Sequence, residues 1–375
     1  RGQSLPIKFR FEQGIVGRVV LSPLTSELEI GQTQLLTPSV FDLHDAAMTC
    51  PVTVTWSSAA PAIAAVSSVG LVTAVSPGTA LVTATCGTVS GFASIEVLAQ
   101  HLTWASMASG TSQDLYGVSG TSATDVFISG DWGTILHYDG AAWTSMASPL
   151  NWHLWALWVN APNDAWIVGP YAGVMRYDGT QWNVLPNATG WDNYAVWGAS
   201  TSDVFVAGPA GVIARYTSGG GTMMTSPTPH YIAGLWGSSA TDVFGVGDGG
   251  QVVHYDGSTW SFQRAYGSGS PLADVWGFAP NDVFAVGMDG TILHYDGTTW
   301  SSMTSGTLEN LNDVWGASPT DVYAVGGNGT ILHYDGLTWS PRPSGTTTTL
   351  TNVWGSSKRT VFVTGQYGLI LRGTK

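Results

Sequence analysis

Residues 282–300, DVFAVGMDGTILHYDGTTW, are the clearest copy of a segment that recurs through the C-terminal part of this 375-residue chain. Each copy opens on an Asp, except for a Thr in the last, and the openings are 39, 39, 39, 40, 39 and 39 positions apart. The opening residues are Asp125, Asp164, Asp203, Asp242, Asp282, Asp321 and Thr360. Each period holds four short strand-like runs, which is typical of a β-propeller blade. The sequence therefore predicts seven blades.

The ends of the repeat region predict how the ring closes. The seventh repeat stops at residue 375 after its third strand, whereas residues 101–109, HLTWASMAS, match the fourth-strand sequence WTSMAS that begins at Trp143. A strand at 101–109 that completes the last blade would close the ring and remove its open sheet edges. We therefore expect Trp104 to lie beside the C-terminal strand.

Residues 17–100 have a different pattern, with short alternating runs separated by Pro and Gly. This pattern is typical of an antiparallel sandwich. The stretch VTWSSAAPAIAAVSSVGLVTAVSPGTALVTAT resembles the bacterial Ig-like group 2 family at residues 56–58, 70–74 and 77–80. The resemblance implies an extracellular spacer or adhesive module. The predicted fold class is therefore all-β, an Ig-like sandwich at 17–100 followed by a seven-bladed propeller at 101–375.

The two cysteines, Cys50 and Cys86, both fall in the Ig-like region. We expect a disulfide between them, which would stabilise the fold by about 4 kcal/mol in the chain-entropy model. Two buried free thiols are the alternative. A disulfide would agree with a secreted or cell-surface protein of bacterial type. The first residue is Arg rather than Met, so removal of a targeting segment is a further expectation.

Residues 1–16 form an N-terminal arm in which Ile7, Phe9 and Phe11 alternate with charged residues. Alternation with period two predicts a strand with one apolar face. Two interpretations remain open. The strand either joins the edge of the Ig-like domain or pairs with a neighbouring molecule, which would give self-association.

The charge distribution limits the partners. The net charge is −13, and residues 19–175 contain no Lys or Arg. We therefore expect no nucleic-acid partner, since phosphates would be repelled. The sequence contains no apolar run long enough for a transmembrane helix, so we expect no membrane insertion.

The repeated Asp and His residues suggest chemistry at first sight, but their pattern favours a structural role. Twelve residues after each opening residue comes His in four repeats and Arg in the other three. Arg keeps a donor for the carboxylate but cannot ligate zinc. We expect structural cross-strand pairs facing each other in each blade, and no metal or cofactor. The pairs with His are Asp125 and His137, Asp242 and His254, Asp282 and His294, and Asp321 and His333.

An enzyme is the rival class. Sialidase-type propellers carry a Ser-x-Asp-x-Gly-x-x-Trp box, whereas this chain has Tyr-Asp-Gly-x-x-Trp. No unique carboxylate pair, Ser-His-Asp set or phosphate loop stands out in the sequence. We therefore predict no catalytic residues and keep a glycan-processing enzyme as a lesser alternative.

Function is expected where the repeats differ. A Trp six residues before the opening residue recurs in six repeats, with Ser119 in the first, and is assigned to packing between blades. Aromatic residues at variable positions are instead restricted to neighbouring blades. At the turn between the second and third strands they are Trp132, Tyr171 and Tyr367, and before the first strand they are Tyr116, Trp152, Trp155, Trp191 and Tyr194.

These eight rings should converge on one sector of one propeller face, because both kinds of loop emerge on that face. Rings that stack on pyranose faces, beside polar groups that hold hydroxyls, are suited to saccharide recognition. Alternatively, the rings pack under their own loops or against the Ig-like domain. Because a fourth strand begins on the opposite face, we expect the Ig-like domain to be a stalk on that far face.

The repeats VWGSS, DVFAVG, GTILHYDG and TW resemble those of secreted bacterial propellers. They are more distantly similar to tectonin-type and Photorhabdus-type propeller lectins. The resemblance implies saccharide or glycoconjugate binding, although the sugar-contacting motifs of those lectins do not match here. The alternative prediction is a self-assembling subunit of a surface layer, sheath or filament that uses residues 1–16 for strand donation.

Overall fold

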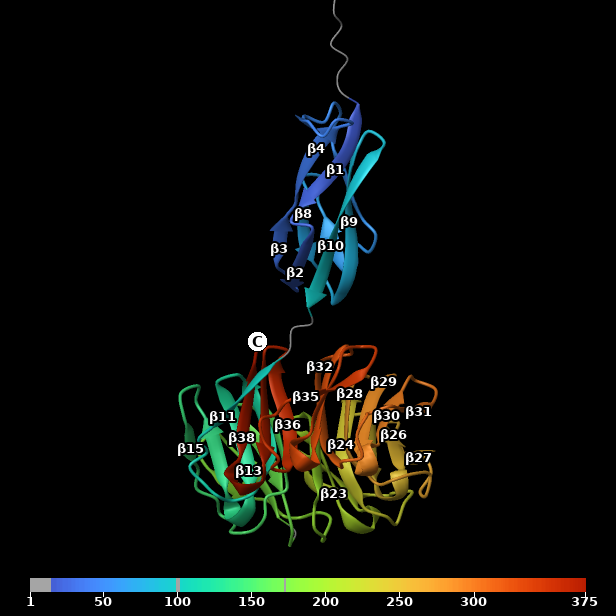
Figure 1. Ribbon diagram of the computed structural model, residues 1–375. Helices are drawn as coiled ribbons and strands as arrows, with labels where there is room; N and C mark the ends of the chain where they lie inside the picture. The colour runs from blue at the N-terminus through green and yellow to red at the C-terminus, as the bar shows by residue number, and fades with distance from the viewer. Residues whose placement is uncertain (1–14, 99–101, 172) are drawn as a thin grey trace, which may run out of the picture. The chain divides into compact units, whose positions relative to one another are not determined.

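The chain folds as two compact all-β units, Arg1–His101 and Leu102–Lys375 (Figure 1). The structure, a computed structural model, describes residues 15–98, 102–171 and 173–375. All but the last two residues of the N-terminal arm, 1–16, lie outside the described residues. Within the described part, no helix has the length and apolar content needed to cross a bilayer.

The first unit is a sandwich of ten described strands in three sheets. The largest sheet has the order β2 (Thr25–Glu29), β10 (Val89–Leu98), β9 (Gly78–Cys86) and β6 (Thr55–Ser58). A second sheet contains β1 (Val16–Ser22), β4 (Thr37–Asp42) and β5 (Ala47–Met48), and a third contains β3 (Thr33–Leu35), β8 (Leu71–Ala74) and β7 (Ala64–Val66). Alternate residues of β9 and β10 are buried in the core, as the period-two pattern predicts.

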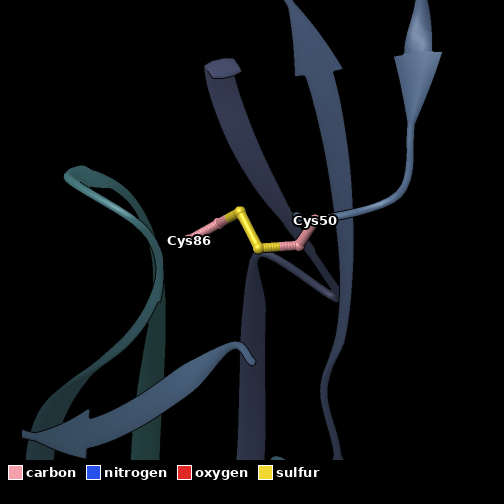
Figure 2. Close-up of a disulfide and its surroundings, with 2 residues drawn as sticks. All are labelled: Cys50 and Cys86. Atoms are coloured by element: carbon pink, nitrogen blue, oxygen red, sulfur yellow. A yellow bond between two sulfur atoms is a disulfide. The ribbon is translucent and has the colours of Figure 1, made fainter. Parts of the chain in front are cut away.

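The structure pairs Cys50 with Cys86 in a disulfide (Figure 2). Cys50 lies between β5 and β6, and Cys86 is the buried last residue of β9. The Cα atoms are 5.9 Å apart. The bond ties an irregular connection to the central strands of the largest sheet, and the alternative of two free thiols is not observed.

The second unit contains seven four-stranded sheets arranged in a ring (Figure 1). Blade 1 contains β12 (Leu115–Ser122), β13 (Asp125–Gly130), β14 (Ile135–Tyr138) and β15 (Trp143–Ser145). Blade 2 contains β16 (Ala156–Ala161), β17 (Asp164–Val168), β18 (Val174–Tyr177) and β19 (Trp182–Val184), and blade 3 contains β20 (Ala195–Ser200), β21 (Asp203–Ala207), β22 (Ile213–Thr217) and β23 (Gly220–Met224).

The remaining blades follow the same meander. Blade 4 contains β24 (Ile232–Ser239), β25 (Asp242–Gly247), β26 (Val252–Tyr255) and β27 (Trp260–Arg264), and blade 5 contains β28 (Leu272–Ala279), β29 (Asp282–Gly287), β30 (Ile292–Tyr295) and β31 (Trp300–Met303). Blade 6 contains β32 (Leu311–Ser318), β33 (Asp321–Gly326), β34 (Ile331–Tyr334) and β35 (Trp339–Arg342). Blade 7 contains β36 (Leu350–Ser357), β37 (Thr360–Gly365), β38 (Ile370–Thr374) and β11 (Thr103–Met107).

The ring closes as the sequence predicts. Strand β11, from the start of the unit, pairs antiparallel with β38, from its end, and Trp104 lies opposite Gly373. The Trp104 ring also makes an edge contact with Tyr323 of blade 6, with 6.1 Å between centroids. The innermost strands of neighbouring blades contact one another around the whole ring, including β12 with β36. Closure therefore combines hydrogen bonding with contact between blades.

A Trp against a Gly is the repeated contact between inner strands. Trp158 of blade 2 lies so close to Gly198 of blade 3 that a Cβ there would meet its ring at 2.5 Å. Blades 1 and 2 differ, because Ser119 replaces the Trp and Val159 replaces the Gly. The Val159 amide donates to Ser119 Oγ at 3.2 Å. At this interface the small residue is Ser119 of blade 1 and the larger one is Val159 of blade 2, the reverse of the usual arrangement, so the interface stays filled.

The turn between the second and third strands has one feature in common in all seven blades. Its middle residue has a positive φ, from 52° at Asn328 to 59° at Gly249 and Tyr367. In six blades the turn is a short 3₁₀ segment, at Asp131–Gly133, Pro209–Gly211, Asp248–Gly250, Met288–Gly290, Gly327–Gly329 and Gln366–Gly368. These turns and the equivalent turn of blade 2, called the tip turns below, carry Trp132, Tyr171 and Tyr367.

Candidate functional site

The repeated acid and base residues are hydrogen bonded to each other in blades 1 to 6. His137 Nε2 is 2.7 Å from Asp125 Oδ1, and the corresponding distances are 2.6 Å for His254 and Asp242, 2.7 Å for His294 and Asp282, and 2.8 Å for His333 and Asp321. Arg176 and Arg215 bond Asp164 and Asp203 in the same way.

The prediction that these pairs face each other directly is wrong in register. His137 lies opposite Phe127, and Asp125 reaches it diagonally from two residues away. The Phe127 and His137 rings are 4.4 Å apart between centroids. Diagonal partners lie on the same face of a sheet and remain within reach of long side chains. Each bond therefore ties the two central strands of its blade.

Five of the eight predicted ligand-binding aromatics are solvent-exposed and belong to adjacent blades. We call Trp132, Trp152, Tyr171, Trp191 and Tyr367 the aromatic sector; their exposed fractions are 61%, 38%, 72%, 56% and 73%. Trp152 makes an edge contact with Tyr171, with 5.2 Å between centroids, and Trp132 is 5.7 Å from His153. These contacts leave part of every one of the five side chains accessible to solvent.

Hydrogen bonds hold three tip turns against the loop that enters the next blade. The Tyr171 amide donates to Asp192 Oδ1 at 2.7 Å, and the Tyr367 amide donates to Asp114 Oδ1 at 2.8 Å. In blades 5 and 6 the Asp289 amide donates to Asn310 Oδ1 at 3.1 Å. The tip residues are therefore fixed by backbone bonds, and their side chains project away from them.

Large aromatic residues are unusual at such a backbone position. Trp132, Tyr171 and Tyr367 have φ values of 54°, 53° and 59°. This left-handed conformation costs a residue with a Cβ roughly 1–2 kcal/mol and is easier for Gly or Asn. Gly249 and Asn328 occupy the same position in blades 4 and 6. The three rings are thus kept despite a local energetic cost and high exposure.

The other three predicted aromatics have a different environment. Tyr116, Trp155 and Tyr194 are half-buried and line a cavity of about 450 Å³ on the propeller axis, so they are not exposed with the other five. Trp155 and Tyr194 make an edge contact at 5.3 Å. Small or polar residues line the rest of the same level, at Ala233, Ala273, Asn312 and Thr351. At this level the cavity wall is aromatic in blades 1 to 3 only, whereas the recurrent Trp residues of blades 2 to 7 also line the cavity.

Carboxylates lie beside these tyrosines. Burial, a hydrogen bond to Asp131 and the charge of Asp114 raise the pKa of Tyr116. Burial and the charge of Asp192 raise the pKa of Tyr194. Asp131 also contacts His153 Nδ1. The same acidic residues therefore hold the loops of the aromatic sector and act on the cavity wall.

The structure also reveals a carboxyl pair that the sequence reading missed. Asp274 of β28 and Asp313 of β32 line the axial cavity and are hydrogen bonded to each other. Asp313 Oδ2 accepts the Val353 amide of blade 7 at 2.6 Å. Burial raises the pKa of Asp274 to about 6, and burial with the charge of Asp274 raises that of Asp313. A signal was present, since carboxylic acids stand where the first four repeats have Gly or Ala and the seventh has Asn352.

A second feature that the sequence did not predict is a further pair of aromatic rings at blade 4. His230 and Tyr266 stack face to face, with 3.5 Å between ring centroids. Tyr266 lies in the irregular link that follows β27, where the repeat gives no alignment. Across the described part of the chain, no three His, Cys, Asp or Glu residues are grouped as metal ligands.

Comparison with known proteins identifies both folds. The family model of the bacterial Ig-like domain (group 2) matches residues 15–97, so the first unit is a domain of this kind. The fold and site together define a two-unit all-β protein in which this domain precedes a seven-bladed propeller. No curated protein matches the chain.

The chain is similar to three solved propellers. YCF48 from Cyanidioschyzon merolae has 15% identity and a TM-score of 0.60 over 72% of this chain and 98% of that chain. YCF48 bound to D1 peptide has 18% identity and a TM-score of 0.61 over 72% and 95%. The WD40 β-propeller domain of Doa1 has 10% identity and a TM-score of 0.61 over 74% and 98%. At these identities the likeness establishes the propeller fold alone.

Proposed function

We propose that this protein is a non-enzymatic saccharide-binding protein exported by a bacterium, with the aromatic sector as its binding surface. The proposal rests mainly on five exposed aromatic rings on adjacent blades, three of which are at strained tip positions. Exposed rings cost solubility and, at the tips, stability, so a function that uses them explains their presence. The bacterial Ig-like domain supports a secreted or cell-surface location.

The spacing of the sector favours an extended ligand. Trp132 and Tyr367 are at the tips of blades 1 and 7, Tyr171 is at the tip of blade 2, and Trp191 precedes blade 3. A saccharide chain could stack successive pyranose faces on these rings, and nearby Asp and Asn oxygens could accept its hydroxyl hydrogens. No reaction is required of these groups, which agrees with a binding role.

The test is binding of the full chain to a glycan array, compared with Trp132→Ala and Trp191→Ala. We expect the wild type to bind a saccharide class and each variant to lose about tenfold in affinity, as stacking contributions of about 1 kcal/mol or more per ring imply. Trp143→Ala is the matched control, because that Trp packs against Phe362 outside the sector. Absence of glycan binding by the wild type would contradict the proposal.

A peptide is the second candidate ligand, because one similar propeller was solved bound to the D1 peptide. Aromatic residues also anchor protein interfaces. A peptide array probed with the same variants distinguishes the two. Peptide binding that depends on Trp132 and Trp191, without glycan binding, would replace saccharide recognition.

Assembly through residues 1–16 is the remaining alternative. It is favoured by the alternation of Ile7, Phe9 and Phe11 with charged residues. Size-exclusion chromatography of the chain with and without these residues tests it. A higher oligomer that disappears on truncation would support assembly, and a monomer with the arm intact would exclude strand donation.

A further inference from the structure

Each of three exposed rings in the aromatic sector has a carboxylate at its base. Asp114 accepts the amide of Tyr367, Asp192 accepts the amide of Tyr171, and Asp131 precedes Trp132 in the same turn. Each of these bonds uses one carboxylate oxygen and leaves the charge in place. The negative charges therefore lie close to the backbone of the residues that carry these rings.

Lys and Arg are missing from the described part of the same surface, where His153 is bonded to Asp131. In the described residues of the tip turns of blades 7, 1 and 2, and of the loops entering blades 1, 2 and 3, there is no Lys or Arg. Arg176 and Arg215, the cations of blades 2 and 3, are bonded to Asp164 and Asp203 within their sheets. The charge of the whole chain, −13, has the same sign.

A surface that combines aromatic rings with carboxylates favours a positively charged ligand. The face of an aromatic ring attracts a cation, and a carboxylate behind the ring adds to that attraction. An anionic saccharide would be repelled by the same groups. A neutral saccharide would gain stacking but nothing from the three carboxylates.

We propose that the ligand of the aromatic sector is a saccharide with protonated amino groups, such as a polymer of glucosamine units that lack N-acetyl groups. This inference rests on the saccharide function proposed above and narrows it. Pyranose rings stack on Trp132, Tyr171 and Tyr367, and the ammonium groups lie near Asp131, Asp192 and Asp114.

The test compares two ligands that differ only in the amine. Binding of the full chain is measured by calorimetry with β-1,4-linked glucosamine oligomers and with fully N-acetylated oligomers of the same length. At low salt we expect the amine form to bind about tenfold more tightly. At about 1 M salt, where the Debye length is about 3 Å, this preference should disappear.

Two substitutions remove charge without removing the loop bonds. Asp114→Asn and Asp192→Asn keep an Oδ1 acceptor for the amides of Tyr367 and Tyr171, as Asn310 already does for Asp289. We expect the double variant, which keeps Asp131, to lose most of the preference for the amine form and to keep its affinity for the acetylated form. Asp256→Asn is the control, because Asp256 holds a turn between third and fourth strands.

Each result has a defined meaning. Equal binding of the two oligomers, or an undiminished preference in the double variant with unchanged thermal stability, overturns the amine inference and leaves saccharide recognition standing. Binding of an acidic or neutral glycan instead of either oligomer would likewise overturn the amine inference and leave saccharide recognition standing. If no glycan binds while an oligolysine peptide does, the saccharide function and this inference both fail.

Discussion

At the scale of single residues, the axial cavity contains a carboxyl pair that binds three blades together. Asp313 accepts the Val353 amide and is bonded to Asp274, whose Oδ2 lies 3.5 Å from the Val314 amide. In blade 7 the equivalent residue is Asn352, which accepts the Val118 amide at 2.9 Å. An amide therefore makes the same link between blades without a charge.

The carboxyl pair should make the folded state more stable at acidic pH. A group whose pKa is raised on folding stabilises the folded state fully when the pH is below the unfolded-state pKa, which is about 4 for Asp. This stabilisation is lost as the pH rises through the folded-state pKa, which is about 6 for Asp274. Asp313→Asn should therefore raise the thermal midpoint at pH 8 by a few degrees, as about 1 kcal/mol does in a large domain.

Scanning calorimetry from pH 4 to pH 8 checks this prediction. The difference between Asp313→Asn and the wild type should shrink towards pH 4. Asn352→Asp is the reverse variant, which adds a carboxyl to the same row and should lower the midpoint at pH 8. A constant difference at every pH would show that the pair is not protonated as described.

A second residue-scale prediction concerns the strained tips. Tyr367 has a φ of 59° and is 73% exposed, whereas Asn328 occupies the same position in blade 6. Tyr367→Asn should raise the unfolding free energy by about 1 kcal/mol, because Asn tolerates this conformation better, while weakening ligand binding. Chemical denaturation measures the first effect and glycan binding the second. Asn328→Tyr is the reverse control, and a loss of stability in Tyr367→Asn would refute the strain argument.

At the scale of strands, neighbouring blades compensate for each other where the repeat is broken. Trp354 lies close to Gly120, and Trp315 close to Gly355, but Ser119 of β12 lies against Val159 of β16. A Trp and a Gly on adjacent strands thus form one unit of packing, as do a Ser and a Val. Core volume is conserved across the interface rather than within a blade.

Restoring the common pair in both strands tests this compensation. Ser119→Trp alone should lower the thermal midpoint, since Val159 fills the space that the ring needs, and Val159→Gly alone should leave a void. The double variant should recover much of both losses, with a coupling energy of roughly 1–3 kcal/mol. Additive losses would show that the two positions do not share one packing unit.

The repeat explains which strand-level features could be predicted. A constant 39-residue register, interrupted once by 40, predicts seven similar sheets, and the fourth-strand sequence around Trp104 predicts the closing strand. Contacts between side chains of different blades, or outside the repeat, were not predictable from the register alone. The Asp274 and Asp313 pair spans two blades, and Tyr266 lies in a link of irregular length. Tyr116 is half-buried because of the shape of the axial cavity, and an alignment of the repeats gives no information on that shape.

At the scale of the whole molecule, closure makes the propeller depend on a strand that precedes all of its blades. Strand β11 is the outer strand of blade 7 and lies beside β38, and Trp104 contacts Tyr323 of blade 6. Without β11 the edge of β38 would be unpaired, and an open edge invites association with other chains. The last blade would also lose an aromatic contact with its neighbour.

Two truncations that differ by one strand test this dependence. A chain that starts at residue 102 retains β11, and a chain that starts at residue 110 lacks it. We expect the longer form to unfold in one cooperative transition near the wild-type propeller temperature. The shorter form should unfold at a lower temperature, by many degrees, and should self-associate in light scattering as concentration rises. Equal midpoints would mean that hydrogen bonding by β38 to β37 suffices to hold the ring, with the contacts between inner strands β12 and β36 supplying closure.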